Sequence, residues 1–258
     1  MTSDIGDMKR YKKSVWTHPL SMKYHLEQWE KPKQSTFAFE EFFRHEFTKS
    51  QTILDIGCGT GSSTYHLARK FPETNFIGID NSLSLVNKAK QLSKKNSLKN
   101  LSFEYGDVFS INKKFAGSDG VISLQTLSWL SEINKPMKQI FKIQPNWIGV
   151  SSLFYEGDIS CKILVTEHRY KRNFNFNVYS IEQLSKVASK FGYQLLKFSP
   201  FEIDIDISKP QDIDKLGTFT EKIVSNLQVK RIQISGPLLL NWYFVLLVKK
   251  SYRSSLIF

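Results

Sequence analysis

A glycine-rich turn between a predicted strand and a predicted helix constrains this fold more than any other feature. Segment 53–61 reads Ile-Leu-Asp-Ile-Gly-Cys-Gly-Thr-Gly, an apolar run that ends in an acid and continues with glycine at every second position. Segment 62–71 follows with apolar residues at helical spacing. This order of strand, tight turn and helix predicts the opening unit of a doubly wound, mostly parallel α/β sheet that binds a nucleotide. Glycine is needed because the backbone must turn sharply and let a ligand approach.

Two acids near this turn restrict the kind of nucleotide. The glycines read G-x-G-x-G, whereas a dinucleotide site reads G-x-G-x-x-G and a P-loop needs Gly-Lys-Ser/Thr. Asp55 ends the first strand, where it suits a cationic group of the ligand. Asp80 ends the next strand, where a carboxylate can accept hydrogen bonds from both hydroxyls of a ribose. A ligand with a ribose, a carboxylate and positive charge but no phosphate fits these groups, and S-adenosylmethionine (SAM) has all of them.

Four motifs in this order resemble those of the class I SAM-dependent methyltransferases, small-molecule type. Segment 55–61 looks like motif I, and Asp80 matches the family's ribose-binding acid. Segment 103–108 resembles the third-strand motif, whose aspartate contacts the adenine amino group, and segment 119–130 is similar to the fourth-strand motif. The resemblance implies a Rossmann-like fold with a seven-stranded sheet and SAM as the cofactor. The cofactor-binding residues that it implies are Asp55, Gly57, Cys58, Gly59, Gly61, Asp80, Asn81, Asp107, Val108, Leu124 and Gln125.

Each motif also has a purely structural interpretation. Gly57 and Gly59 could mark a tight turn without a ligand, and Asp80 could cap the helix that follows it. Asp107 follows a glycine and could be an ordinary turn aspartate. Cys58 is expected to be a small thiol packed in the turn rather than a nucleophile or a redox group.

The N-terminal residues are predicted to form a lid. Segments 21–29 and 34–47 have helical patterns, separated at Pro32. We expect a polar arm up to about residue 19 within an arm and lid of residues 1–48, a methyltransferase domain over 49–250 and a tail over 251–258, all in one globular domain. Tyr24 or Trp29 could shield the SAM sulfonium through cation–π contact, although core packing is the alternative for the aromatic residues here. The residues expected in the lid or at the substrate are Tyr24, Gln28, Trp29, Ser35, Trp129 and Phe154.

Beyond the glycine turn the chain alternates between strand and helix patterns. Strands are expected near 52–56, 75–80, 101–105, 119–124 and 147–153, and helices near 62–71, 82–95 and 131–143. The regular pattern ends after the fifth strand. The expectations there are an aromatic and charged connection over 154–178, a helix from its cap Ser180 to about residue 191, a strand within 193–207, a polar excursion over 211–228, and strands over 231–235 and 242–249.

Methyl transfer is an in-line displacement, so an enzyme must position the acceptor and, for a hydroxyl acceptor, remove its proton. These groups are expected outside the carboxyl ends of strands four and five. His168 is the first candidate base because an unperturbed imidazole titrates near neutrality. Glu156 is the second candidate or could orient His168, and the adjacent Tyr155 is a third candidate catalytic residue. The alternative for His168 is a solvated position in a charged run. The sequence shows no metal-ligand set.

The charge of the chain leaves several partners open. A net charge of +12 over 258 residues suits a polyanion or a phosphorylated small substrate, and also a solvated lysine-rich surface. Scattered lysines and few arginines make nucleic acid an unlikely partner. No apolar run is long enough to span a bilayer and no signal peptide is recognisable, so we expect a cytoplasmic protein without a membrane span. The oligomeric state stays open.

The acceptor is suggested by resemblance alone. Segments 28–36 and 232–244 resemble methyltransferases encoded with bacterial capsule and surface-polysaccharide genes, which implies a small anionic acceptor such as a sugar, a nucleotide sugar or a phosphorylated amine. Segment 125–129 is similar to small-molecule enzymes of the trans-aconitate type, although Ser128 stands where they usually have histidine. The alternatives are an RNA or protein methyltransferase and a non-catalytic SAM-binding partner subunit. Methylation of a DNA amino group is disfavoured, because no Asn/Asp-Pro-Pro-Tyr/Phe motif follows strand four.

Overall fold

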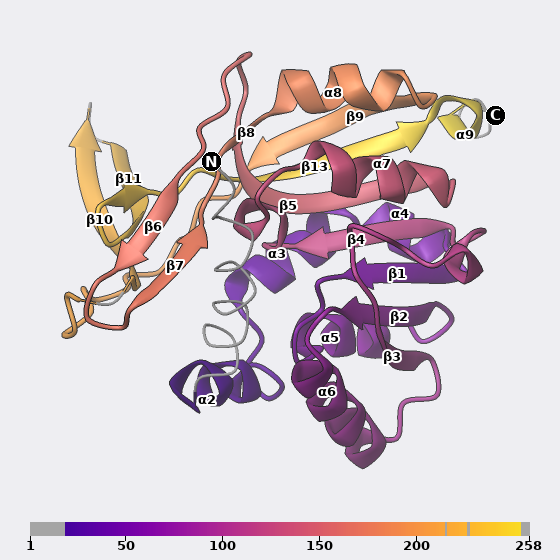
Figure 1. Ribbon diagram of the computed structural model, residues 1–258, viewed down its shortest axis with the longest axis horizontal. Coiled ribbons are helices and arrows are strands. Elements are labelled where there is room, and N and C mark those ends of the chain that lie inside the picture. The colour runs from indigo at the N-terminus through magenta and orange to yellow at the C-terminus, as the bar shows by residue number, and fades with distance from the viewer. Residues whose placement is uncertain (1–18, 215, 226–227, 254–258) are drawn as a thin grey trace, which may run out of the picture.

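A central sheet with helices on both faces organises the chain (Figure 1). The structure is a computed structural model that describes residues 19–214, 216–225 and 228–253, so the predicted arm up to residue 18 and the end of the predicted tail lie outside the described residues. The strand order is β3-β2-β1-β4-β5-β13-β9. These strands are β1 (Thr52–Ile56), β2 (Asn75–Asp80), β3 (Leu101–Tyr105), β4 (Gly120–Leu124), β5 (Trp147–Tyr155), β9 (Tyr193–Pro200) and β13 (Trp242–Lys249).

The sheet is mostly parallel, which confirms the predicted α/β Rossmann-like fold. Strands β1 to β5 pair in parallel, whereas β13 runs antiparallel to both of its neighbours, β5 and β9. The short strand β8 (Tyr179–Ser180) adds to the end of β5. Since parallel strands end at one edge, the carboxyl ends of β1, β2 and β4 and the motifs that follow them share that edge.

Two hydrophobic cores form because successive residues of a strand point to opposite faces of the sheet. Leu54 of β1 packs in the core beneath α7 (Asn134–Lys142) and α8 (Ile181–Ser189). Its neighbour Ile53 packs in the core beneath α5 (Ser62–Lys70) and α6 (Leu83–Asn96). The Ser180 hydroxyl accepts a hydrogen bond from the Gln183 backbone N–H at 3.0 Å, which confirms the predicted cap of α8.

The N-terminal helices lie on the face that carries α5. They are α2 (Pro19–Glu27), α3 (Gln34–Phe42) and α4 (Arg44–Lys49). The single helix predicted over 34–47 is wrong, because the chain leaves helical geometry at Phe43, with φ −106° and ψ 12°. Phe39, Phe43 and Phe47 are all fully buried in the core. A buried contact of 2.6 Å between Glu40 Oε2 and His66 Nε2 joins α3 to α5.

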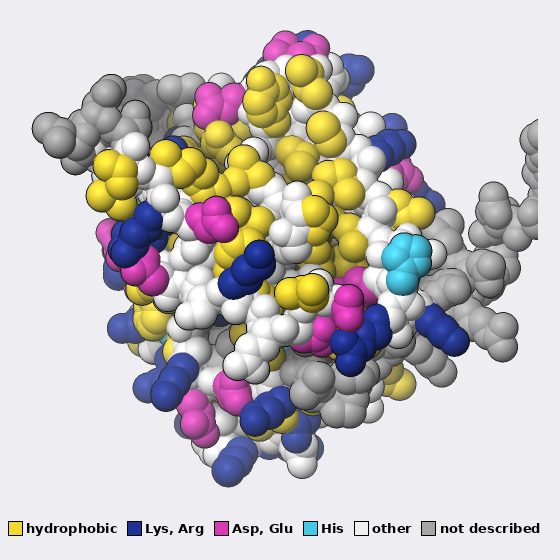
Figure 2. All heavy atoms as spheres, turned by 90° about the vertical axis from the view of Figure 1, so that its left-hand side faces the viewer, with side chains coloured by type: hydrophobic (Ala, Val, Ile, Leu, Met, Phe, Trp, Pro, Cys, Tyr) yellow, Lys and Arg dark blue, Asp and Glu magenta, His cyan; other side chains and the backbone are white. Residues whose placement is uncertain are grey.

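Two small sheets stand at the edge where the parallel strands end. The arrows of β4 and β9 point toward them in Figure 1, and the same side faces the viewer in Figure 2, where hydrophobic side chains form a band with charged ones around it. One sheet is the hairpin of β6 (Leu164–Glu167) and β7 (Arg172–Asn175). The other contains β10 (Thr218–Ser225), β11 (Gln228–Ser235) and β12 (Leu238–Leu239).

This region corrects one prediction from the sequence, because the polar excursion predicted over 211–228 contains the whole of β10. The strand predicted within 193–207 is β9, which ends at Pro200, and the chain over 201–207 is irregular. The remaining short elements are the 3-10 turns η1 (Lys113–Phe115) and η2 (Leu127–Trp129) and the helix α9 (Lys250–Arg253). Within the described ranges, none of the helices combines the length and the apolar character needed to cross a membrane.

Candidate active site

The glycine turn after β1 leaves space for a ligand at its centre. Gly57, Gly59 and Gly61 all have positive φ, at 76°, 58° and 81°. A Cβ atom on Gly57 would lie 2.4 Å from the Thr126 side chain, and one on Gly61 would lie 2.3 Å from the Phe103 ring. A Cβ atom on Gly59 would have no atom within 4 Å. Packing therefore requires the outer two glycines, while the middle one faces open space that a ligand can enter.

Two carboxyl groups are close to this space. Asp55 is buried at the end of β1, and one of its oxygens accepts a hydrogen bond of 2.6 Å from the Thr64 hydroxyl. Asp80, at the end of β2, accepts hydrogen bonds from the backbone N–H of Gly59 at 2.9 Å and of Ser82 at 2.8 Å. The Ser82 bond agrees with the structural alternative for Asp80. The Gly59 bond brings the carboxylate to the glycine turn, where each of its oxygens can accept a further hydrogen bond.

Low solvent access changes how these acids ionise. Burial raises the pKa of Asp55 to about 7, against the opposing effect of the Thr64 hydrogen bond, and the charge of Asp80 contributes a smaller increase. Burial also raises the pKa of Asp80, although hydrogen bonds from Ser82 and Gly59 lower it. A ligand cation placed beside both groups would favour their ionised forms. The site therefore fits the positively charged, ribose-containing cofactor expected from the sequence.

The structure gives different environments to four other residues that were predicted to bind the cofactor. Burial, with a further contribution from Asp55 and Asp80, raises the pKa of the Cys58 thiol well above its ordinary value, in agreement with a packed thiol rather than a nucleophile. Asp107 accepts a hydrogen bond of 2.9 Å from the Phe109 backbone N–H, so it forms a turn whatever else it binds. The side chain of Val108 is buried in the core, and Asn81 is exposed.

The end of β4 is held against the glycine turn. Leu124 is half-buried there, and Gln125 has φ 54°, an uncommon conformation for a residue other than glycine. The Gln125 backbone N–H donates to the Ser151 carbonyl at 2.8 Å, and the Thr126 hydroxyl donates to the Gly57 carbonyl at 3.2 Å. Such strained positions occur often at ligand sites, because surrounding contacts must hold them in place.

Among the residues predicted for the lid, Trp29 contacts the same turn. The Trp29 indole N–H donates to the Thr60 carbonyl at 2.9 Å, and its ring stacks on Tyr65 with 4.5 Å between centroids. The Ser35 side chain is half-buried. Gln28 is buried, and its Nε2 has no hydrogen-bond partner among the described residues. Trp29 is therefore joined to the glycine turn and buried in the core with one ring face covered, in agreement with the core-packing alternative.

A lysine that the sequence analysis did not select lies beside Gln125. The Lys33 ammonium is 3.5 Å from Gln125 Oε1 and 5.3 Å from the centroid of the Tyr24 ring, which is itself 52% exposed. Lys33 is half-buried, and within the described part of the chain no ion pair neutralises it. Burial, and secondarily the charge of Lys33, lowers the pKa of His25 to about 4. No local pattern identifies Lys33, because it is distant from Gln125 in the sequence.

The predicted catalytic residues do not converge on this place. His168 lies in the exposed turn at the outer end of the β6–β7 hairpin, as a solvated position would require. Tyr155 is 47% exposed at the end of β5, and Glu156 accepts a hydrogen bond of 3.0 Å from the Tyr243 hydroxyl. The prediction that Phe154 contacts the acceptor is wrong, because its side chain is fully buried in the core beneath α7 and α8.

Trp129 also belongs to the packing of the small sheets rather than to an open site. Its ring lies 5.1 Å from that of Phe174 and 4.9 Å from that of Phe176, measured between centroids. The Ser128 hydroxyl, at the position that usually holds histidine in trans-aconitate-type enzymes, is buried within 2.5 Å of the Ser152 hydroxyl. The Ser128 hydroxyl is therefore part of a buried hydrogen bond and does not replace the histidine as a base.

Residues 47–148 match the family model described as a methyltransferase domain. This segment contains the glycine turn, both acids and Gln125. The segment is therefore similar to a methyltransferase domain. The malonyl-[acyl-carrier protein] O-methyltransferase of Priestia megaterium is 33% identical over 167 residues, which cover 61% of this chain and 58% of that protein. The trans-aconitate 2-methyltransferase of Deinococcus radiodurans is 36% identical over 80 residues, 31% of this chain and 28% of that protein. The chain thus spans less than two thirds of the length of these relatives.

Solved structures share the fold over nearly the whole chain. The magnesium protoporphyrin IX methyltransferase from Synechocystis PCC 6803, crystallised with bound S-adenosylhomocysteine, has a TM-score of 0.52 and 12% identity, covering 95% of this chain and 93% of that chain. Identity this low shows the fold alone. The family match over residues 47–148 agrees with S-adenosylmethionine as the cofactor expected from the sequence.

Proposed function

We propose that this chain is a SAM-dependent methyltransferase that methylates an oxygen or a nitrogen of a small anionic acceptor, such as a sugar, a nucleotide sugar or a phosphorylated amine. The observation that supports this most strongly is the open space at Gly59, with the Asp80 carboxylate bound to the Gly59 backbone and the buried Asp55 carboxyl within the electrostatic influence of Asp80. Lys33 adds a positive charge near the end of β4.

On the cofactor side, each acid has a distinct task. Asp80 is bound to the Gly59 backbone and retains lone pairs that can accept the ribose hydroxyls. Asp55 can balance a cationic group of the ligand, since a buried carboxylate without a counter-charge is costly. SAM supplies the electrophilic methyl group when it is bound. The residues described here bind and orient both reactants, and such positioning can contribute a large part of the rate enhancement.

On the acceptor side, Lys33 supports the anionic class. A half-buried ammonium beside an amide oxygen has lost part of its hydration, so a phosphate or carboxylate would recover that loss through a charge-assisted hydrogen bond. We also propose that the acceptor is a building block of a surface polysaccharide, on the resemblance of segments 28–36 and 232–244. The basic balance of the whole chain is consistent with a phosphorylated acceptor.

The test measures transfer of a labelled methyl group from SAM to three kinds of acceptor: nucleotide sugars, phosphorylated amines, and RNA or protein. We expect transfer to a small anionic acceptor. In Lys33→Gln the KM for that acceptor should rise about tenfold, as expected for the loss of one charge-assisted hydrogen bond, while the Kd for SAM changes little. The matched control is Lys31→Gln, an exposed lysine on the same segment. Transfer to RNA or protein alone would contradict the proposal, and so would an unchanged KM in Lys33→Gln.

A further inference from the structure

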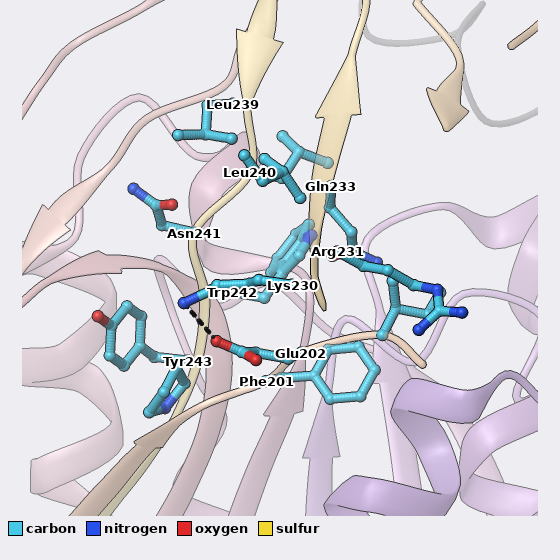
Figure 3. Close-up of a pocket in the computed structure, with 13 residues that line it drawn as sticks. Phe201, Glu202, Lys230, Arg231, Gln233, Leu239, Leu240, Asn241, Trp242 and Tyr243 are labelled. Carbon is cyan, nitrogen blue, oxygen red and sulfur yellow. Dashed lines mark ion pairs between the residues drawn. The ribbon is translucent and has the colours of Figure 1, made fainter. Parts of the chain in front are cut away.

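A pocket of about 240 Å³ lies between the β10–β11–β12 sheet and the central sheet (Figure 3). Its walls come from the segment that follows β9, from β11, and from the chain that leads from β12 into β13. Phe201, Leu240 and Trp242 supply apolar surface, while Gln233 and Asn241 supply amide groups. The pocket lies outside the segment 47–148 that matches the methyltransferase model, and several of its residues belong to segment 232–244.

One polar atom of the pocket lacks a partner. The side-chain oxygen of Gln233 is buried and accepts no hydrogen bond among the described residues. A buried carbonyl oxygen without a donor is unfavourable, so a ligand hydroxyl or N–H would bind it favourably once the Gln233 side chain turns to present this oxygen to the pocket. Asn241 is exposed and offers both a donor and an acceptor at the pocket.

The charged groups of the pocket are already paired. The Lys230 side chain reaches across to Glu202, with 2.7 Å between Nζ and Oε1 (Figure 3). Arg231 is held by Asp206 at 2.7 Å. The Lys230–Glu202 pair is exposed on both sides and therefore contributes little to stability, so a ligand can replace it at small cost. Because the charges balance, the pocket suits a neutral ligand that both donates and accepts hydrogen bonds.

The position of the pocket relates it to methyl transfer. Trp242 begins β13 opposite Leu153, near the carboxyl end of β5, so the pocket opens at the same edge of the sheet as the glycine turn. The strands β1, β4, β5 and β13 are consecutive neighbours. With 4.7–4.9 Å between neighbouring strands, β13 lies about 14 Å across the sheet from β1, and its start is displaced further along the strand direction. A molecule methylated near the end of β4 would have to be elongated to reach this pocket.

We propose that this pocket is a distal subsite that holds a neutral sugar ring of the acceptor, away from the atom that is methylated. A sugar ring carries several hydroxyl groups that can donate to Gln233 and bond to Asn241, and its apolar face can lie against Phe201 or Trp242. The proposal rests on the proposed function. It adds that the acceptor has at least two parts: an anionic part near Lys33 and a sugar part at Gln233.

The test uses saturation-transfer NMR on the full chain, with the methyl glycosides of glucose, galactose and N-acetylglucosamine as probes. Uridine serves as the nucleoside probe and phosphocholine as the probe without a sugar, and binding of phosphocholine in place of the glycosides would overturn the proposal. We expect at least one glycoside to bind, and its Kd to rise about tenfold in Gln233→Leu and in Asn241→Ala. The stability of Gln233→Leu to urea should not fall, because the substitution removes a buried unpaired oxygen. The matched control is Gln91→Leu, an exposed glutamine on α6, which should bind glycosides as the wild type does.

Titration of SAM into the same samples separates the two proposals. If SAM binds but none of the glycosides does, or if both pocket variants bind them unchanged, the subsite proposal is overturned while the proposed function stands. Binding of uridine in place of the glycosides would also overturn it, in favour of a nucleoside. If SAM does not bind to the wild type, the proposed function fails, and with it the role of the pocket in methyl transfer.

Discussion

The raised pKa of the Asp55 carboxyl leads to a quantitative prediction about cofactor binding. Burial raises the pKa of this carboxyl to about 7 in the free protein, and a ligand cation beside it would favour the ionised form. The ionised fraction then rises from roughly a tenth at pH 6 to roughly nine tenths at pH 8. If SAM binds only the ionised form, its affinity should increase about tenfold over this range, or about 1.4 kcal/mol. SAM affinity should rise with pH because a higher pH removes the proton of the Asp55 carboxyl, which competes with the ligand cation.

Asp55→Asn isolates the effect of the Asp55 charge on SAM affinity. The asparagine side chain can still accept a hydrogen bond from the Thr64 hydroxyl, but it does not titrate. The amino group of SAM titrates near pH 8, so the informative quantity is the ratio of wild-type to variant affinity. Isothermal titration at pH 6, 7 and 8 should show this ratio rising about tenfold. Proton release on binding to the wild type, measured in two buffers of different ionisation enthalpy, should be largest below pH 7. Parallel pH profiles for wild type and Asp55→Asn would refute the reasoning.

Three further predictions concern the turn, the lid and the cap. Gly59→Ala and Gly117→Ala both place a Cβ in open space at positive φ and should each cost about 1–2 kcal/mol in unfolding by urea, but only Gly59→Ala should weaken SAM binding. Trp29→Phe loses the hydrogen bond to Thr60, worth about 1 kcal/mol, so SAM affinity measured by titration should fall about fivefold; unchanged affinity would exclude this anchoring role. Ser180→Ala removes a helix cap and should lower the unfolding free energy by about 1 kcal/mol without affecting SAM, and an effect on SAM binding would contradict that separation.

The first half of the fold was predictable because its elements carry strong local patterns. The strands expected near 52–56, 75–80 and 101–105 have the observed boundaries, since each is an apolar run that ends in a turn residue or an acid. The glycine turn was predictable for the same reason, because all three glycines have positive φ and a Cβ on Gly57 or Gly61 would overlap a neighbouring side chain. These inferences needed no knowledge of distant contacts.

The rest depends on contacts that local patterns do not encode. Strand β10 carries Glu221 and Lys222 at exposed positions. These charges make the segment resemble a polar loop in the sequence, although it pairs with β11 in the structure. The alternation over 201–207 indicates a strand, yet the chain there leaves the central sheet for the second one. His168 has a suitable side chain in an unsuitable place, at a hairpin turn. Lys33 has an ordinary local context and becomes important only because folding places it beside Gln125.

The most direct test of the central claim is the titration of ligand-free protein with SAM and with S-adenosylhomocysteine, in the wild type and in Asp80→Asn. The account predicts saturable binding of both ligands to the wild type. In the variant, both should bind more than about tenfold more weakly, since a charge-assisted hydrogen bond to the ribose is worth about 1.5–3 kcal/mol. Absence of binding to the wild type, or equal affinity in Asp80→Asn, would contradict the assignment of this edge of the sheet as the SAM site.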